Sequence, residues 1–331
     1  MATEIKYTVT EGGAYQTIQA ALDALYSSYP NLVTADRYAS IEIDGSWTNP
    51  AGTNIAPNGS FVTDATRYIK IYTTAAARHS GKWSTTKFRI EASNTAILNN
   101  ATGFVWLDGL QFKLTASSAT SDVYYASHPA SSWLRISNCL AYGVASGSQI
   151  ICGYHSGSDI AHTTYLWNNI FWDFISAGSN GIAIYGNEAS PVLYCYSNTV
   201  HNSEYGIFNL GTMHAKNNGV VGGTTRYYNG GTFDGTKNSS DNNDALGTNP
   251  INGTPTFVDA SNANHQLRDF HLQSSDTLWK NAGYDTSGES APLNFTTDID
   301  GDTRSTWDVG ADEYVAAGGG DISRPLTGVS G

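Results

Sequence analysis

Two acidic side chains, Asp173 and Glu204, are the best placed in this sequence for glycoside hydrolysis, which needs two carboxyl groups on one bond. Asp173 lies four positions after Asn169, and Asn202 lies four positions after Asn198. Stacking of these two segments would therefore bring Asp173 close to Glu204. Two carboxylates without an environment that shifts their pKa values are not a site. We name this pair as the catalytic candidates and expect both to be solvated wall residues.

Asp298, Asp300 and Asp302 alternate along a short acidic run, and closely spaced carboxylates are ligands that Ca²⁺ prefers. The run is not an EF-hand loop, because Gly301 falls at its fourth position and Val309 at its twelfth. The alternative, which we favour, is a tight turn in which the Asp side chains bond the backbone. Calcium is therefore the one cofactor that the sequence suggests.

A cationic loop interrupts a chain that is otherwise poor in basic residues. It contains Arg78, His79, Lys82 and Lys87, with Trp83 among them. One interpretation is a contact for a carbohydrate or an acidic ligand, with Trp83 as the stacking surface. The other, which we favour, is a structured loop whose side chains anchor it to the body of the protein.

Aromatic side chains crowd the middle of the chain. Strand alternation must turn some of these rings outward, where they suit sugar stacking or a protein interface. The sequence does not assign the outward ones. The rings considered are Tyr124, Tyr125, Tyr154, Tyr165, Trp167, Trp172, Tyr185, Tyr194, Tyr196, Tyr205, Tyr227 and Tyr228.

Composition narrows the classes of function. The 331 residues carry a net charge of −12, and the 17 Lys and Arg residues form no run, which argues against nucleic acid and anionic membranes as partners. No stretch approaches the roughly 20 apolar residues of a membrane span. The N-terminus has no secretory signal pattern. Cys139, Cys152 and Cys195 form no metal spacing, so we expect small buried side chains.

The elements that would position these residues follow from a repeat. A polar residue between bulky neighbours returns at intervals of 30, 31, 29 and 20 residues, at Asp108, Asn138, Asn169, Asn198 and Asn218. Alternation is strand periodicity, and recurrence at this spacing indicates stacked coils. We therefore predict an all-β parallel solenoid in which Asp108, Asn138, Asn169 and Asn198 stack at one corner. The same register places inside the column Leu110, Leu140, Phe171 and Val200.

One amphipathic helix precedes the coils, with Ile18, Ala21, Leu22 and Leu25 at helical spacing. Such a helix would cover the open end of the column. The expected organisation is an N-terminal strand and capping helix over 1–36 and coils over 37–255. A closing segment over 256–315 follows, and then a Gly-rich tail over 316–331 that is flexible or ordered by a partner.

The chain resembles right-handed parallel β-helix proteins of the pectate-lyase-like superfamily. The resemblance lies in Tyr15–Ala24, similar to the N-terminal cap of that superfamily, and in Asp298–Arg304 with Asp308–Tyr314, similar to a closing motif. The Arg78–Lys87 loop is similar to loops of β-helix proteins from tailed phages. The resemblance implies a single-stranded right-handed parallel β-helix. It does not imply an activity, because this fold hosts lyases, hydrolases, adhesins and phage spikes.

The catalytic motifs of the polygalacturonase-like members are missing from the coil region, and its acids and bases show no grouping. We therefore expect a non-enzymatic phage virion protein, such as a fibre, spike or decoration protein, that binds a receptor or glycan. Expected partners are other virion or surface proteins and a polysaccharide. The phage resemblance implies a homo-oligomer, specifically a homotrimer, on a virion or extracellular surface. The alternative is a polysaccharide lyase or glycoside hydrolase acting as a depolymerase.

Overall fold

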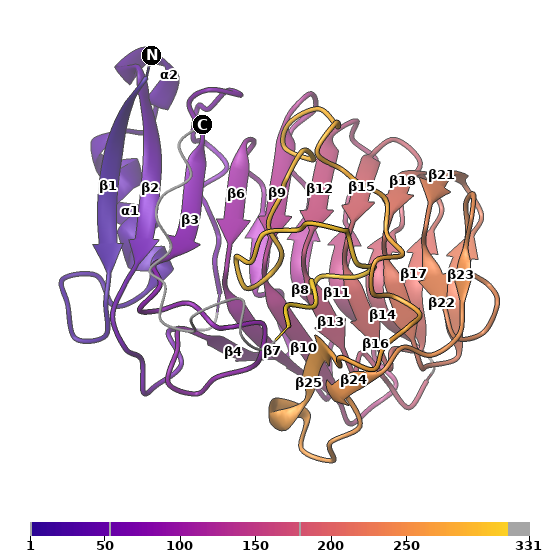
Figure 1. The fold of residues 1–331 in the computed structure, drawn as a ribbon. Helices are drawn as coiled ribbons and strands as arrows, with labels where there is room; N and C mark the ends of the chain where they lie inside the picture. The colour runs from indigo at the N-terminus through magenta and orange to yellow at the C-terminus, as the bar shows by residue number, and fades with distance from the viewer. Residues whose placement is uncertain (1, 53, 179, 317–331) are drawn as a thin grey trace.

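A computed structural model describes residues 2–52, 54–178 and 180–316. The tail predicted over 316–331 lies outside the described residues beyond position 316. Successive strands pair in parallel with strands one coil away, and they form three long sheets around one axis (Figure 1). The chain is therefore a parallel β-helix, which confirms the predicted solenoid.

The three sheets share a simple order, in which each strand pairs with its counterpart on the next coil. The nine-stranded sheet contains β1 (Thr3–Val9), β2 (Arg37–Ile43), β3 (Ile69–Thr73), β6 (Val105–Asp108), β9 (Trp133–Ser137), β12 (Thr163–Trp167), β15 (Val192–Tyr196), β18 (Thr212–Lys216) and β21 (Thr232–Thr236). The eight-stranded sheet contains β4 (Ile90–Ser93), β7 (Gln111–Ala116), β10 (Leu140–Ala145), β13 (Ile170–Trp172), β16 (Thr199–His201), β19 (Gly219–Val221), β22 (Ser239–Ser240) and β23 (Ile251–Asn252). The six-stranded sheet contains β5 (Leu98–Asn100), β8 (Ser121–Ala126), β11 (Ile151–Ser156), β14 (Gly181–Gly186), β17 (Tyr205–Asn209) and β20 (Thr225–Asn229).

One apolar core fills the column between the sheets. It includes Ile136 from β9, Phe112 from β7 and Tyr124 from β8, each with no exposed surface. Alternate residues of most strands point into this core, so the residues between them form the outer walls. β8 departs from this alternation, because the adjacent residues Val123 and Tyr124 both lie in the core. The walls are therefore the surfaces on which a functional site can be built.

From β6 onward, each coil turns from the nine-stranded to the eight-stranded sheet through two residues. The second points inward, and the Nδ2 atoms of Asn169, Asn198 and Asn218 donate to the Oδ1 atoms of Asn198, Asn218 and Asn238 at 3.0, 3.0 and 2.9 Å. These buried amides connect successive coils. The first residue has a left-handed backbone at Gly109, Asn138, Asn168, Ser197, Asn217 and Lys237.

The predicted stacking register is right for Asn169 and Asn198 and wrong for Asp108 and Asn138. Cys139 occupies the inward position of its coil, where its N–H donates to Asn169 Oδ1 at 2.9 Å. Asn138 is the left-handed residue before it, with φ of 53°, and Asp108 is the last residue of β6. Asn suits both positions of the turn, so its spacing alone cannot distinguish them.

The predicted interior positions hold for Leu110, Phe171 and Val200, which lie in the central core. Leu140 is the exception, because Ala141 is the residue in register with Phe171 and Leu140 faces outward. It is nevertheless buried, since the outer face of the eight-stranded sheet is covered by other parts of the chain. The apolar cluster on that face also contains Trp83, Tyr142, Ile170, Trp172, Phe270 and Ile299.

The predicted N-terminal helix is α1 (Ile18–Ser28), and α2 (Leu32–Ala35) follows it. Thr17 caps α1, because its side chain accepts a hydrogen bond from the Ala20 N–H at 3.1 Å. The buried residues of α1 join the central core beside the first strands of the nine-stranded sheet (Figure 1). Within the described residues, no helix is long and apolar enough to cross a membrane.

The segment after β23 returns along the side of the stack, where it crosses the nine-stranded sheet (yellow in Figure 1). It contains β24 (Phe257–Asp259), a 3₁₀ turn (His265–Leu267) and β25 (Asp269–Leu272), with β24 and β25 antiparallel. Leu293 packs with Trp167 and Tyr196 on the nine-stranded wall. The buried Arg304 guanidinium donates to Asn168 Oδ1 at 3.0 Å, which ties the segment to the coil corner.

Candidate functional site

A continuous line of cationic and aromatic side chains runs along the outside of the nine-stranded sheet. Its members occupy the same register position on successive coils and alternate with residues of the central core. We call this line the outer ladder. It consists of Lys70, Trp106, Arg135, Tyr165, Tyr194 and His214.

Neighbouring members of the outer ladder are in contact. Lys70 Nζ lies 3.8 Å from the centre of the Trp106 ring, a cation–π geometry. The Tyr165 and Tyr194 rings stack with centroids 5.1 Å apart, and Tyr194 stacks on His214 at 4.7 Å. The wall therefore offers a row of rings that the sheet holds at the spacing of its coils.

Arg135 is the distinctive charge of this wall. Its Cζ lies 3.9 Å from the Trp133 ring centre and 5.9 Å from that of Tyr165. Among the described residues no carboxylate lies within 4.0 Å of its guanidinium, and its buried Nε has no hydrogen-bond partner. By contrast, Lys70 pairs with Asp108 at 3.9 Å. Burial lowers the pKa of Arg135, but guanidinium stays charged in proteins, so an uncompensated cation remains.

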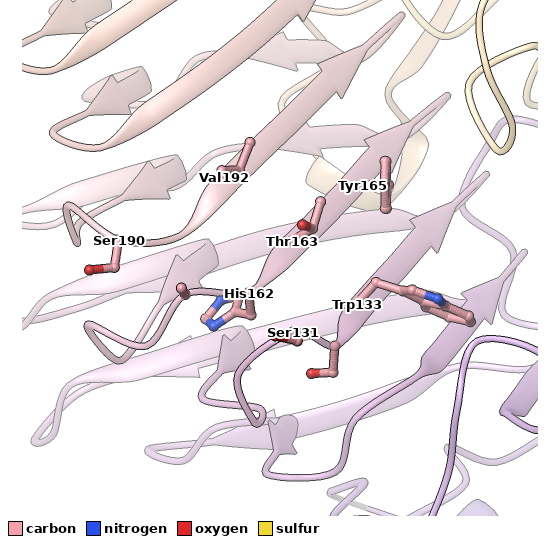
Figure 2. Close-up of a pocket in the computed structure, with 9 residues that line it drawn as sticks. Ser131, Trp133, His162, Thr163, Tyr165, Ser190 and Val192 are labelled. Carbon is pink, nitrogen blue, oxygen red and sulfur yellow. The ribbon is translucent and has the colours of Figure 1, made fainter.

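A hollow of about 250 Å³ lies beside the outer ladder, where three successive coils enter β9, β12 and β15 (Figure 2). Trp133 and Tyr165, whose ring centres lie 3.9 and 5.9 Å from Arg135 Cζ, line it. The same two rings therefore line the hollow and lie beside the unpaired Arg135 guanidinium. The other lining residues are Ser131, Ser132, Ala161, His162, Thr163, Ser190 and Val192.

His162 forms part of the lining and is only 3% exposed. Its ring lies 3.9 Å from that of His128, whose Nδ1 is 2.7 Å from Ser132 Oγ. Neither nitrogen of His162 has a hydrogen bond of good geometry to a described residue. Burial lowers the pKa of His162 to about 4, against a smaller opposing effect of the Ile160 carbonyl. At neutral pH it is therefore an uncharged imidazole with unused nitrogen atoms.

The predicted cationic loop lies on the outer wall and is anchored there. Arg78 lies 3.5 Å from Asp108, and Lys82 Nζ lies 3.3 Å from Asp269. The Trp83 ring is 6% exposed and meets the Tyr142 ring edge-on at 4.9 Å. These contacts match the anchored loop that we favoured, because Trp83 offers little surface for ligand stacking.

His79 of the same loop is buried. Its Nε2 lies 2.9 Å from the Asn138 carbonyl, and its Nδ1 accepts the Gly81 N–H at 3.2 Å. Burial lowers the pKa of His79 to about 3, so the ring is neutral and both nitrogens are occupied. It therefore holds the loop against the coil corner.

The two catalytic candidates have separate partners. The Asp173 carboxylate pairs with Arg268 and His265 of the returning segment, and the Glu204 carboxylate accepts the Gly181 N–H at 2.5 Å. Among the described residues they share no hydrogen-bond partner. Asp173 and Glu204 are also buried rather than solvated, which differs from our expectation for wall residues. The reason is that the returning segment covers Asp173 and the coil backbone encloses Glu204.

The calcium candidates take the form of the tight turn. Asp298 Oδ1 accepts the N–H groups of Asp300 and Asp302 at 3.0 and 2.8 Å, and its Oδ2 accepts that of Glu313 at 2.9 Å. Asp300 instead pairs with His271 at 2.7 Å, while Asp302 is exposed. The three carboxylates therefore do not gather around one point, and calcium binding stays a prediction.

The sequence did not single out Arg135, Trp133 or His162. A signal was available, since each ladder residue from Trp106 to His214 stands three positions before a left-handed corner residue. This spacing can be recognised only when the left-handed corner residue of each coil is known, and our prediction placed Asn138 at the wrong corner position.

Comparisons of the chain with known protein families, characterised proteins and solved structures find no match. The fold and the wall define its class by themselves. It is a parallel β-helix protein with an aromatic and cationic outer face beside a small hollow.

Proposed function

We propose that this protein is a non-enzymatic glycan-binding β-helix, and that the outer ladder and the hollow bind an acidic polysaccharide. The observation that carries the proposal is Arg135, a cation without a carboxylate partner among the described residues, set between Trp133 and Tyr165. A guanidinium binds a carboxylate or sulfate through two parallel hydrogen bonds. Aromatic faces bind the apolar faces of sugar rings.

The negative net charge makes a local cation necessary for binding an acidic ligand. The net charge of −12 disfavours anions over most of the protein surface. Selectivity for an acidic sugar must therefore come from a local cation, and Arg135 is suitably placed beside the hollow. The neutral His162 adds a hydrogen-bonding group without adding charge.

The test is a binding panel of acidic polysaccharides, such as polygalacturonate, alginate and chondroitin sulfate, beside neutral dextran and laminarin. We expect the native protein to bind at least one acidic member more tightly than the neutral ones. Arg135→Ala should weaken that binding roughly tenfold or more, as expected for a lost hydrogen bond to a charged group. Arg135→Lys should be intermediate, because it keeps the charge without the planar fork.

Arg37→Ala is the matched control, because Arg37 lies on β2 of the same sheet but outside the outer ladder. It should leave binding unchanged. Equal losses from the Arg135 and Arg37 substitutions would indicate general charge attraction. Equal binding of acidic and neutral polysaccharides, unaffected by Arg135→Ala, would contradict the proposal.

We also propose that the protein belongs to a phage virion or an extracellular surface, as a receptor- or glycan-binding homo-oligomer, specifically a homotrimer. This proposal rests on the pectate-lyase-like and phage-like resemblance of Tyr15–Ala24, Arg78–Lys87 and Asp298–Tyr314. Sedimentation measurements of the pure protein give the oligomeric state. Electron microscopy of the native source with a specific antibody gives the location. A monomeric mass, or labelling of no particle or surface, would contradict these parts.

The enzymatic alternative, a polysaccharide lyase or hydrolase, has one supporting observation. A neutral imidazole with unused nitrogens, His162, lines the hollow together with Trp133 and Tyr165, the rings beside the unpaired Arg135. Lyase action on a uronate needs a base for the ring proton and a cation for the carboxylate, which these residues would supply. An assay for unsaturated uronate and reducing ends distinguishes the alternatives. Activity lost in His162→Gln would establish the lyase, and no product from any polysaccharide supports binding alone.

A further inference from the structure

Three side chains of metal-binding type meet on the outside of the six-stranded sheet, away from the outer ladder. Asp122 on β8 and Cys152 on β11 are register partners on adjacent coils, and His155 follows on β11. One ligand atom from each residue lies within 4.8 Å of the other two. The cluster therefore brings a carboxylate, a thiol and an imidazole from two successive coils to one point.

The environment of this cluster leaves a negative charge without a permanent counter-charge. Asp122 is 5% exposed and Cys152 is fully buried. Among the described residues the Asp122 carboxylate has no Lys or Arg partner, and His155 Nδ1 lies 3.1 Å from its Oδ1. Because a buried carboxylate is costly without a cation, this site favours a positive group among the three side chains.

We propose that Asp122, Cys152 and His155 form a Zn²⁺ site that links two neighbouring coils. Zinc accepts sulfur, nitrogen and carboxylate oxygen together in tetrahedral geometry, whereas calcium and magnesium require oxygen ligands. Three protein ligands leave one position, which water fills. In this proposal the ion occupies the space between His155 Nδ1 and Asp122 Oδ1, and the Cys152 thiolate completes the protein ligands.

Binding exchanges a proton for the metal ion. A Cys ligand binds zinc as the thiolate, whereas a free thiol carries its proton at neutral pH. When Zn²⁺ binds, the sulfur–hydrogen bond is replaced by a sulfur–zinc bond and the proton leaves to solvent. Affinity should therefore rise with pH. Because the cluster is buried, the ion would be acquired most readily during folding.

The experiment uses full-length protein without a histidine tag, unfolded and refolded with Co²⁺ as the spectroscopic probe. We expect one bound Co²⁺ per chain, with a sulfur-to-cobalt charge-transfer band and tetrahedral visible bands, displaced by Zn²⁺. Cys152→Ser should abolish the charge-transfer band. His155→Gln should weaken Co²⁺ binding by tenfold or more, as expected for a lost ligand.

Cys139→Ser and Cys195→Ser are matched controls, because both thiols are buried, form no disulfide and lie outside the Asp122, Cys152 and His155 cluster. Both variants should keep the full cobalt spectrum. Asp300→Asn tests the second metal-type cluster, formed by His271, Asp300 and Asp312, and should also leave the spectrum unchanged. Refolded protein that takes up no Co²⁺, or a cobalt spectrum that survives Cys152→Ser, would overturn the proposal.

Discussion

Asn198 is the best example of how single side chains hold the coils together. Its Oδ1 accepts hydrogen bonds from the N–H and Nδ2 of Asn169 at 3.1 and 3.0 Å, and its Nδ2 donates to the Leu166 carbonyl at 3.0 Å. All these groups are buried, so no water replaces a lost partner. The amide therefore satisfies polar groups on the preceding coil, and its Nδ2 also donates to Asn218 Oδ1 on the following coil at 3.0 Å.

Asn198→Ala should lower the free energy of unfolding by at least about 2 kcal/mol, because several buried polar groups lose their partners at about 1–3 kcal/mol each. Chemical denaturation measures this loss. Asn99→Ala, at an exposed strand position, is the control and should change stability by less than about 0.5 kcal/mol. Similar losses of stability in both variants would show that the buried corner amides contribute no more to stability than an exposed Asn.

Phe171 tests the apolar core. It is 1% exposed, and a Cβ on Gly153 of the next wall would come within 2.6 Å of its ring. Phe171→Ala should therefore cost about 3–5 kcal/mol, as truncation of a buried Phe does. Denaturant titration checks this value. Phe208→Ala on the outer side of β17 should cost less than half as much.

For single residues, the sequence predicted which side chains face the core in most coils but not in the coil of Cys139. Phe171 and Val200 were predicted correctly, because their coil has the regular Asn169 and Asn198 spacing. Cys139 replaces Asn at the inward position one coil earlier, and the preceding Asn138 mimics the motif. A single such substitution shifts the predicted facing of Leu140 to the wrong side.

Among the elements, the returning segment carries an unusual concentration of buried charge. His271 lies between two carboxylates, with Nδ1 2.5 Å from Asp269 and Nε2 2.7 Å from Asp300. Burial alone would lower the pKa of His271, but hydrogen bonds to Asp269 and Asp300 raise it to about 11. Burial also raises the pKa of the nearby Asp312.

The raised pKa values of His271 and Asp312 both make the fold less stable as the pH rises. A group whose pKa is raised on folding stabilises the fold fully below its unfolded pKa and loses this contribution as pH rises to the folded value. For His271 the loss falls between about pH 6.5 and pH 11. The melting temperature should therefore decline across pH 7–10, and His271→Gln should decline less. Thermal scans across that range check this, and parallel curves would contradict it.

The helix and the outer ladder differ in how far the sequence predicts them. The helix at 18–28 was predictable, because its buried residues Ile18, Ala21, Leu22 and Leu25 follow a clean helical period. The outer ladder was not, because its members share no residue type. Trp106, Arg135 and Tyr165 become one feature only when the coils are stacked in the correct register.

For the whole molecule, the segment after β23 covers the apolar outer face of the eight-stranded sheet. It covers Leu140, Tyr142, Ile170 and Trp172 on the eight-stranded sheet. A chain truncated after Pro255 should therefore expose a large apolar surface, bind a hydrophobic dye and aggregate. Light scattering and dye fluorescence measure this. Truncation after Ala316 is the control, and by the Gly-rich composition beyond it we expect little change.

Coil length varies along the column, and this variation has a consequence for adaptability. Adjacent inward corner residues are 29 or 30 positions apart up to Asn198 and 20 apart from there to Asn238. In the long coils, extra residues form the connections containing Ser131, Ala161 and Ser190, which line the hollow. Lengthening, shortening or exchanging these connections should therefore change ligand preference, while the two-residue corner that repeats between the nine-stranded and eight-stranded sheets keeps the scaffold intact.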